Sequence, residues 1–425
     1  MTDQSKYHSW LNEKRSHAWS VYENTPMPTT KSEEWRYTDL TKLLSLEHLN
    51  LQMTARSHLK APSREHLSET INTSGRIQFA DGLISSLQLT SDIKNRGVIV
   101  DSMQNPQHEK HQEIIQANLG TVLLPPESGK FQALNAARWA DGVIIYVPEN
   151  VHIEMPVRGK HHFTSDKSTR CSRTLIVAEE GSQISYVEEF QSADSENAMV
   201  SSTVEIIAHK NATVDFVSVQ NLGRGTFFQA DQKAVVHRDA TINTLNVNLG
   251  STVTRLDLKT QLAEPGATTK MLGLYFGDQN QHFDHNTSQD HLAPHTGSDL
   301  LYKGALDGDS RATFRGVIRV HSGAQQTDAY QTNRTLLLSD KAQANSLPNL
   351  EIEADDVKCS HGSTVGQLDQ EIIFYLLNRG LSPQQAERLV VLGFLGDVLE
   401  RLPKGAFRRV VNSVTDTLKQ KLSHG

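Results

Sequence analysis

Ile176-Val-Ala-Glu-Glu-Gly-Ser-Gln-Ile-Ser-Tyr-Val187 consists of a short apolar stretch, a polar turn and a second apolar stretch. Three similar stretches follow it, at residues 206–217, 235–245 and 261–272. Their turn residues lie 30, 28 and 27 positions apart, at Gly181, Asn211, Asp239 and Gly266. A strand-and-turn unit that recurs every roughly 20 to 50 residues is typical of a solenoid, and units made only of strands favour a β-helix. On this periodicity alone, a β-sandwich of hairpins remains the alternative.

The period-two pattern occupies the middle of the chain. It begins with the strand 143–147 and gives way to helical spacing after Gln367. We therefore predict an N-terminal helical and mixed region over 1–140, a β-helix core domain over 141–366 and a C-terminal helical domain over 367–425. The predicted fold class is mainly β, a parallel β-helix flanked by N-terminal and C-terminal α-helical regions.

The N-terminal region carries two helical signals. Residues 5–24 have the apolar spacing of an amphipathic helix, which the prolines at 26 and 28 end. A second helix is predicted over 32–45, with Ser32 as its N-cap.

The C-terminal region opens with the apolar face of 372–377 and continues with Ser382-Pro-Gln-Gln385, which has the composition of a capping box. The apolar stripe of the helix that follows includes Ala386, Leu389 and Phe394. A small three-helix unit cannot bury this stripe by itself, so part of it is expected to meet the β domain or a partner protein.

Composition excludes several classes of protein. The 425 residues carry a formal net charge of -7, whereas a nucleic-acid-binding domain requires a basic face. No run of apolar residues is long enough to span a membrane, and the N-terminus lacks the apolar core of a signal peptide. Two cysteines do not make a disulfide framework. We expect a cytoplasmic protein without nucleic-acid or membrane partners.

The stretch Asn349-Leu-Glu-Ile-Glu-Ala-Asp-Asp-Val-Lys-Cys-Ser-His-Gly362 places one of the two cysteines beside a histidine. Its aspartates are expected to end a strand, and a tight polar turn is predicted to follow. In an extended segment Cys359 and His361 would point the same way, and thiolate and imidazole both bind iron. One thiol and one imidazole cannot complete a metal site, so any site is shared with other segments or another chain. The alternative is a structural turn with a buried thiol.

A second patch is rich in imidazoles and carboxylates, which could hold zinc or iron. It consists of His282, Asp284, His285, Asp290, His291 and His295. In a strand, residues 282 and 285 face opposite sides, which favours polar ladder residues over a chelate. The other cysteine, Cys171, is interpreted as a small core or edge residue. The chain has no phosphate-binding loop, no nucleophile elbow and no dinucleotide fingerprint.

Glu353-Ala-Asp-Asp-Val-Lys-Cys-Ser-His-Gly-Ser-Thr-Val-Gly-Gln-Leu-Asp369 closely resembles the C-terminal signature of the SufB/SufD family, the scaffold of the Suf iron–sulfur cluster assembly system. Other family-like motifs occur in the same order along the chain, at 31–40, 282–291, 301–304 and 323–339. The resemblance implies a right-handed parallel β-helix, which decides against the sandwich.

The resemblance also implies a non-catalytic scaffold subunit that works with the paralogue SufB and the ATPase SufC. The C-terminal helices would dock the ATPase, through a surface that we place around Ala386, Leu389 and Phe394. The end of the β-helix that bears the signature would pair with SufB and support iron acquisition and cluster formation there. His361 matches the family histidine of the cluster-forming interface, and Cys359 matches a neighbouring family cysteine. Two cysteines are too few for a stable cluster, so the expected cluster is transient or shared at the subunit interface.

Two alternatives accompany this prediction. A SufB-like paralogue would act as the cluster scaffold itself, but a sulfur-accepting role requires thiols that this chain lacks along its β domain. A β-helix enzyme acting on polysaccharides would require carboxylates in an exposed groove. In isolation, the chain could also form a homodimer.

Overall fold

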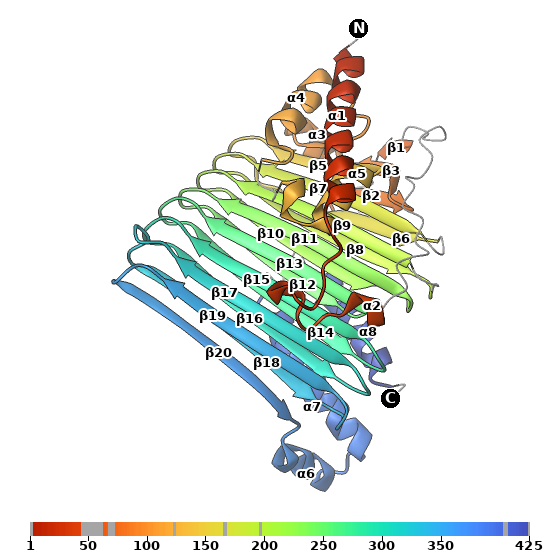
Figure 1. Cartoon of the computed structure of the whole chain (residues 1–425), viewed down its shortest axis with the longest axis vertical. Helices are drawn as coiled ribbons and strands as arrows, with labels where there is room; N and C mark the ends of the chain where they lie inside the picture. The colour runs from red at the N-terminus through yellow and green to blue at the C-terminus, as the bar shows by residue number, and fades with distance from the viewer. Residues whose placement is uncertain are drawn as a thin grey trace.

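The computed structural model describes residues 3–43, 63–66, 73–121, 125–164, 168–194, 198–402 and 407–423. Most of them form a parallel β-solenoid of about eight turns, flanked by helices at both ends of the chain (Figure 1). The mainly β fold predicted from the repeat is confirmed. Among the helices within the described ranges, none is both long and apolar enough to cross a membrane.

Two sheets form the walls of the solenoid. The 11-stranded sheet contains, in spatial order, β1 (Ser63–His66), β3 (Leu83–Leu89), β2 (Gly75–Ala80), β6 (Val157–Phe163), β8 (Gln183–Ser192), β10 (Thr213–Asn221), β12 (Thr241–Asn248), β14 (Thr268–Gly277), β16 (Gly297–Leu306), β18 (Thr327–Leu337) and β20 (Val357–Gln367). The 9-stranded sheet contains β19 (Gln343–Ile352), β17 (Arg311–Val320), β15 (His282–His291), β13 (Val253–Leu262), β11 (Thr226–Val236), β9 (Ala198–Ala208), β7 (Thr169–Ala178), β5 (Asp141–Val147) and β4 (Ile99–Ser102). From β5 onward, successive strands alternate between the sheets and pair in parallel with the strand one turn away, whereas β2 pairs with β3, and β4 with β5, in antiparallel fashion.

The turns between the sheets stack into a ladder. All four turn residues predicted from the repeat have left-handed backbones, with φ of 69° at Gly181, 58° at Asn211, 54° at Asp239 and 76° at Gly266. Glycine, asparagine and aspartate tolerate this conformation best. Consecutive turns are joined by backbone hydrogen bonds, such as the one from the N–H of Gly181 to the C=O of Lys210. A Cβ added at Gly266 would lie 2.0 Å from Oδ1 of Asp239, so close stacking also requires glycine there.

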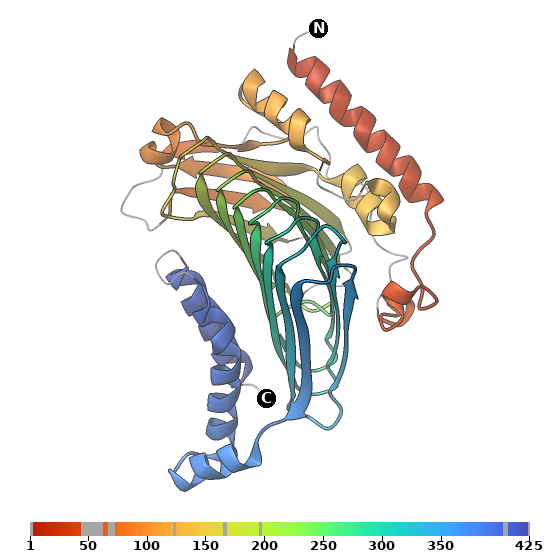
Figure 2. The same ribbon diagram turned by 90° about the vertical axis from the view of Figure 1, so that its left-hand side faces the viewer.

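The N-terminal helices lie against the outer surface of the solenoid, most of them near its first turns, whereas the segment 33–43 lies farther along it (Figures 1 and 2). They are α1 (Asp3–Asn24), η1 (Glu33–Trp35), α2 (Leu40–Leu43), α3 (Ser91–Asn95), α4 (Glu109–Asn118), η4 (Pro126–Ser128) and α5 (Lys130–Arg138). Tyr7, Leu11 and Ala18 of α1 are buried, as the amphipathic spacing requires.

The prediction of one continuous helix over 32–45 is wrong. Only η1 and α2 form there, and the Ser32 hydroxyl donates to the C=O of Thr29 instead of capping a helix. Tertiary contacts override the helical propensity: the buried Thr38 hydroxyl donates to Asp284, and Nη1 of Arg255 donates to the C=O of Glu34 at 2.7 Å. Residues 44 and 45 lie outside the described residues.

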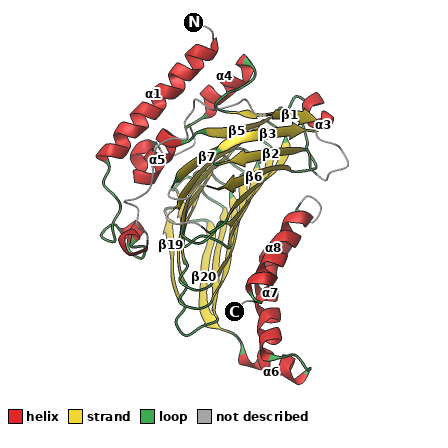
Figure 3. Cartoon of the chain, turned by 90° about the vertical axis from the view of Figure 1, so that its right-hand side faces the viewer, coloured by secondary structure: helices red, strands yellow, loops and turns green. Residues whose placement is uncertain are grey.

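The C-terminal helices α6 (Gln370–Asn378), α7 (Pro383–Glu400) and α8 (Arg408–Lys421) follow the last strand. The predicted capping box at Ser382 and Gln385 is present at the start of α7. α7 and α8 lie along the outer face of the 11-stranded sheet (Figure 3), where Val391, Leu395 and Val414 pack with apolar residues of β10 to β16. An ion pair of 2.6 Å between Lys303 Nζ and Asp397 Oδ2 joins β16 to α7.

The two ends of the solenoid differ. At the first end, β1 to β4 continue the sheets and helices α1 and α4 lie nearby (Figure 1). At the other end, β19 and β20 are the outermost strands, and no described strand pairs with their outer edges. The division of the chain at residues 140 and 366 stays a proposal: β5 begins at Asp141 and β20 ends at Gln367, but β2 and β3 from the earlier region belong to the same sheet.

Candidate functional site: the open end of the solenoid

Cys359 and His361 lie in β20, the outermost strand of the 11-stranded sheet. The tight polar turn predicted at these residues is therefore wrong, because the polar segment pairs with β18 over its whole length. The prediction that the two side chains share a face agrees with a strand. In register, Cys359 faces Ala329 and His361 faces Gln331, and both of those residues are buried. Cys359 and His361 therefore continue the inward-facing rows of the solenoid.

The last turn exposes positions that every earlier turn buries. Val365 is 40% exposed, whereas its register partner Thr335 in β18 is 2% exposed. Likewise, Ile352 in β19 is 40% exposed and its partner Val320 is 0% exposed. His361 is also exposed. These are core positions that no described turn covers, and within the described part of the chain the backbone edge of β20 beside them is unpaired. Such an edge is a template for pairing with another chain.

The chemistry of this end comes from a thiol, an imidazole and a buried amide. Cys359 packs with Ala324, Ala329 and Ala354, and partial burial raises the pKa of its thiol above the ordinary value, with Asp328 adding to the shift. In the isolated chain the thiol is therefore protonated at neutral pH. Gln331, beneath His361, is 1% exposed, and neither of its amide atoms makes a hydrogen bond within the described residues. Its amide is therefore a buried polar group without a partner among the described residues, in the row directly beneath His361.

The two cysteines are expected to differ in reactivity. Cys171 is buried in β7 among Tyr7, Leu11 and Leu175, and burial raises the pKa of its thiol to about 12. Iodoacetamide should therefore modify Cys359 first in the native chain. Its rate should rise with pH toward a midpoint above about 8.5, the ordinary cysteine value, because only the thiolate attacks. Mass spectrometry of peptides after timed labelling measures both rates. Faster labelling of Cys171, or a midpoint below the ordinary value, would contradict this description.

The structure disperses the histidine-rich patch. His282 and Asp284 point out of the solenoid: His282 Nε2 lies 2.9 Å from the Thr38 hydroxyl, and Asp284 accepts from Nη1 of Arg255 at 2.7 Å. His285 points into the core beside Tyr275 and Tyr302, where burial lowers the pKa of its imidazole to about 3.

The remaining members of the patch lie elsewhere. The two ring nitrogens of His291 each lie 2.8 Å from a hydroxyl, one of Thr296 and the other of Ser298. Asp290 Oδ1 lies 2.9 Å from Nε2 of His321. His295 lies in a turn and has a left-handed backbone. Within the described ranges, no group of three or more His, Cys, Asp or Glu side chains could hold a metal ion. The geometry favours the ladder interpretation of this patch.

The candidate ATPase-binding residues differ in accessibility. Ala386 is fully buried, Leu389 is 52% exposed, and the Phe394 ring is half-buried with Lys303 Nζ 4.7 Å from its centroid. The larger apolar surface is on α6, which buries none of its residues and exposes Phe374 and Tyr375 by 65% and 56%. Sequence reasoning found the apolar character of α6 but not its exposure, because spacing does not show whether a neighbour covers a face.

Comparison with known proteins gives consistent matches over nearly the whole chain. Residues 161–394 match the family described as "SUF system FeS cluster assembly, SufBD core domain", and residues 2–158 match "SufBD protein N-terminal region". The chain is 29% identical to the iron–sulfur cluster assembly protein SufD of Bacillus subtilis, over 97% of this chain and 94% of that protein. SufB of the same organism is 28% identical over 74% of this chain and 68% of that protein. A SufBD family protein of Staphylococcus haemolyticus is 26% identical over 93% of this chain and 86% of that protein.

Proposed function

Because the chain belongs to the SufBD family of iron–sulfur cluster assembly proteins, we propose that it is the SufD-type subunit of a Suf complex. In this role it is a scaffold without catalytic activity that pairs with a SufB-type paralogue and a SufC-type ATPase in the cytoplasm. The similarity to a protein named SufD extends over 97% of the chain, while that to a protein named SufB covers 74%, which favours the SufD-type assignment over a SufB-like scaffold.

The observation that carries the proposal is the open end of the solenoid. The exposed Val365 and Ile352 occupy rows that are buried one turn earlier, and the edge of β20 is unpaired within the described residues. The paralogue supplies the covering surface, since a related solenoid presents the same strand spacing and the same rows. When the paralogue is absent, a second copy of this chain occupies the same end as a homodimer.

The nascent cluster is the cargo of this interface. His361 contributes an imidazole that can ligate iron when neutral, and Cys359 contributes a thiol next to it. The protonated state of that thiol in the isolated chain fits a site that becomes competent only when iron or the partner lowers its pKa. With two ligands from this chain, the remaining ligands come from the partner, so the cluster is shared and transient.

The C-terminal helices provide the ATPase-binding surface in this proposal. α7 and α8 bury their apolar stripes on the solenoid, whereas Ile372, Phe374 and Tyr375 on α6 and Leu389 on α7 remain exposed. An exposed apolar patch next to a helix pair that is firmly attached to the sheet can transmit a movement of the ATPase to the solenoid. Hydrolysis by the ATPase would then shift the paired scaffold between two states.

Charges placed at the open end test the pairing. The double variant Val365→Glu and Ile352→Glu should weaken association with the SufB-type paralogue by at least ~10-fold, because each charge would be desolvated in the interface. The dissociation constant is measured by sedimentation or light scattering over a concentration series. Met155→Glu is the matched control, since Met155 is 39% exposed and lies just before β6, toward the opposite end of the 11-stranded sheet from β20. Equal affinities of the double variant, the control and the unmodified chain would refute pairing through this end.

A further inference from the structure

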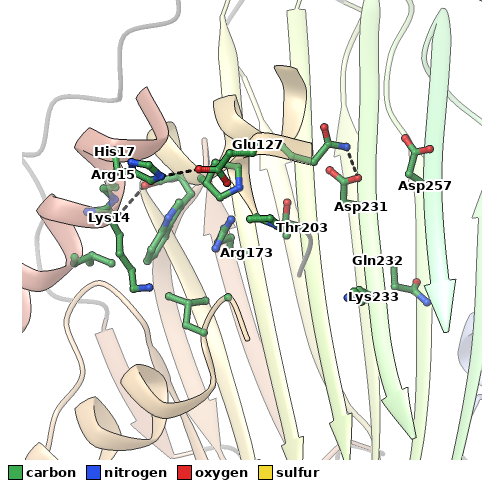
Figure 4. A pocket seen from close by; sticks show the side chains of 18 of the residues that line it. Lys14, Arg15, His17, Glu127, Arg173, Thr203, Asp231, Gln232, Lys233 and Asp257 are labelled. Atoms are coloured by element: carbon green, nitrogen blue, oxygen red, sulfur yellow. Dashed lines mark hydrogen bonds and ion pairs between the residues drawn. The ribbon is translucent and has the colours of Figure 1, made fainter. Parts of the chain in front are cut away.

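A cavity of about 280 Å³ lies between the N-terminal helices and the outer face of the 9-stranded sheet, remote from β19 and β20 (Figure 4). Leu11, Leu119, Pro125 and Trp139 form its apolar wall, and residues of β7, β9, β11 and β13 form its polar wall. A concave site with an apolar wall and a few convergent charges is the usual form of a small-molecule site.

The carboxylates of the cavity already have partners. Glu127 lies 2.8 Å from Nε2 of His17. Asp231 accepts from the side-chain amides of Gln132 and Gln229 at 2.8 and 2.7 Å. The carboxylate of Asp257 accepts two hydrogen bonds from the guanidinium of Arg255, at 3.0 and 2.9 Å. Burial, and next the charge of its register partner Asp257, raise the pKa of Asp231 to about 7, so Asp231 is only partly ionised at neutral pH and repels an anion less than an ordinary aspartate would.

The lysines of the cavity are in the opposite situation. Lys233 and Lys259 are register partners on neighbouring strands, and Lys14 of α1 also lines the cavity, near the ring of Trp10. Within the described residues, none of the three ammonium groups lies within salt-bridge distance of a carboxylate. Like charges directly opposite each other in a sheet are destabilising. Burial, and next the charge of Lys259, lower the pKa of Lys233, and the charges of Asp290 and Glu205 offset this only in part. A bound anion would remove this repulsion.

We propose that the cavity binds a small phosphate monoester, with its phosphate facing Lys233 and Lys259 and its apolar part along Leu11, Leu119 and Trp139. Two adjacent ammonium groups match the double negative charge of a phosphate monoester better than the single charge of a carboxylate, and ammonium groups bind phosphate as point charges. A ligand in this place joins α1 to the sheet and fastens the N-terminal helices to the solenoid. The proposal is independent of the function proposed for the open end.

Titration of the full chain with phenyl phosphate tests the site by calorimetry and by thermal unfolding. The unmodified chain should bind it saturably at one site and unfold at a higher temperature in its presence. Inorganic phosphate should bind more weakly, because it leaves the apolar wall uncovered. The double variant Lys233→Gln and Lys259→Gln should bind phenyl phosphate at least ~10-fold more weakly, through loss of two charge-assisted contacts.

The matched control is Lys94→Gln with Lys110→Gln, which changes the net charge equally at two exposed positions away from the cavity. The control should bind like the unmodified chain. Without ligand, the cavity variant and the control should unfold at similar temperatures, because loss of the repulsion between the two lysines is opposed by loss of the attraction of Lys233 to Asp290 and Glu205. Absence of saturable binding by the unmodified chain, equal binding by inorganic phosphate, or equal weakening in the control would each overturn the proposal.

Discussion

Replacing His361 with alanine should lower the iron and sulfide content of the reconstituted mixed complex by at least ~10-fold, the cost typical of losing a residue that serves a metal site. The side chain is exposed at the open end, where it contributes little packing, so assembly of the subunits should not change. Iron and sulfide are determined on complex isolated by size after reconstitution, together with the subunit ratio.

Two variants isolate the role of His361 from general effects. His162→Ala removes another exposed imidazole from β6 of the same solenoid and should leave cluster content unchanged. Cys359→Ala separates the thiol from the imidazole, because a merely packed thiol costs only modest stability when truncated. Normal iron and sulfide with His361→Ala would show that the imidazole of His361 has no role in cluster assembly.

The second large effect concerns the exposed apolar surface of the C-terminal helices. Phe374→Glu and Leu389→Glu together should abolish capture of the SufC-type ATPase. Buried anchors of an interface contribute roughly 2 kcal/mol or more each, about 30-fold in affinity. Both residues are more than half exposed in the isolated chain, and α6 keeps its cap because Oδ1 of Asp369 accepts from the N–H of Glu371 at 2.9 Å.

These substitutions are preferable to removal of the chain from residue 382. α7 and α8 cover Leu245, Leu272 and Leu301 of the sheet, so truncation would expose these core residues. A loss of ATPase binding by the truncated chain could then result from unfolding and not from loss of the docking surface. The control is Met155→Glu, because Met155 is 39% exposed and lies between β5 and β6, away from the C-terminal helices. The circular dichroism spectrum should be the same for all variants and the unmodified chain. Full capture of the ATPase by the double variant would place the docking surface elsewhere.

The repeat was predictable because the solenoid imposes the same local demand at each turn. A corner with a left-handed backbone favours glycine, asparagine or aspartate. These residue types therefore recur at the corners of the solenoid, at Gly181, Asn211, Asp239 and Gly266. The capping box at Ser382 is predictable for the same reason, since its residues bond to one another.

Features that depend on distant contacts were not predictable. Thr38 and Glu34 are held by Asp284 and Arg255 from the sheet, and no local pattern shows that these bonds replace a helix. The strand at Cys359 and His361 is not evident from the sequence, because polar residues, including His361 and Ser363, interrupt its apolar row between Val357 and Val365. Only the pairing with β18 shows that the segment is extended. The charges of the cavity beside α1 come from separate strands, so only the register brings Lys233 and Lys259 together.

The central claim is that β20 pairs with the paralogue, and amide hydrogen exchange across residues 357–367 tests it most directly. The unpaired edge of β20 should exchange quickly in the isolated chain. Addition of the SufB-type paralogue should slow its exchange by at least ~10-fold, because newly bonded amides exchange only when the interface opens. Unchanged exchange in 357–367, with protection appearing on another surface while the complex forms, would contradict the account.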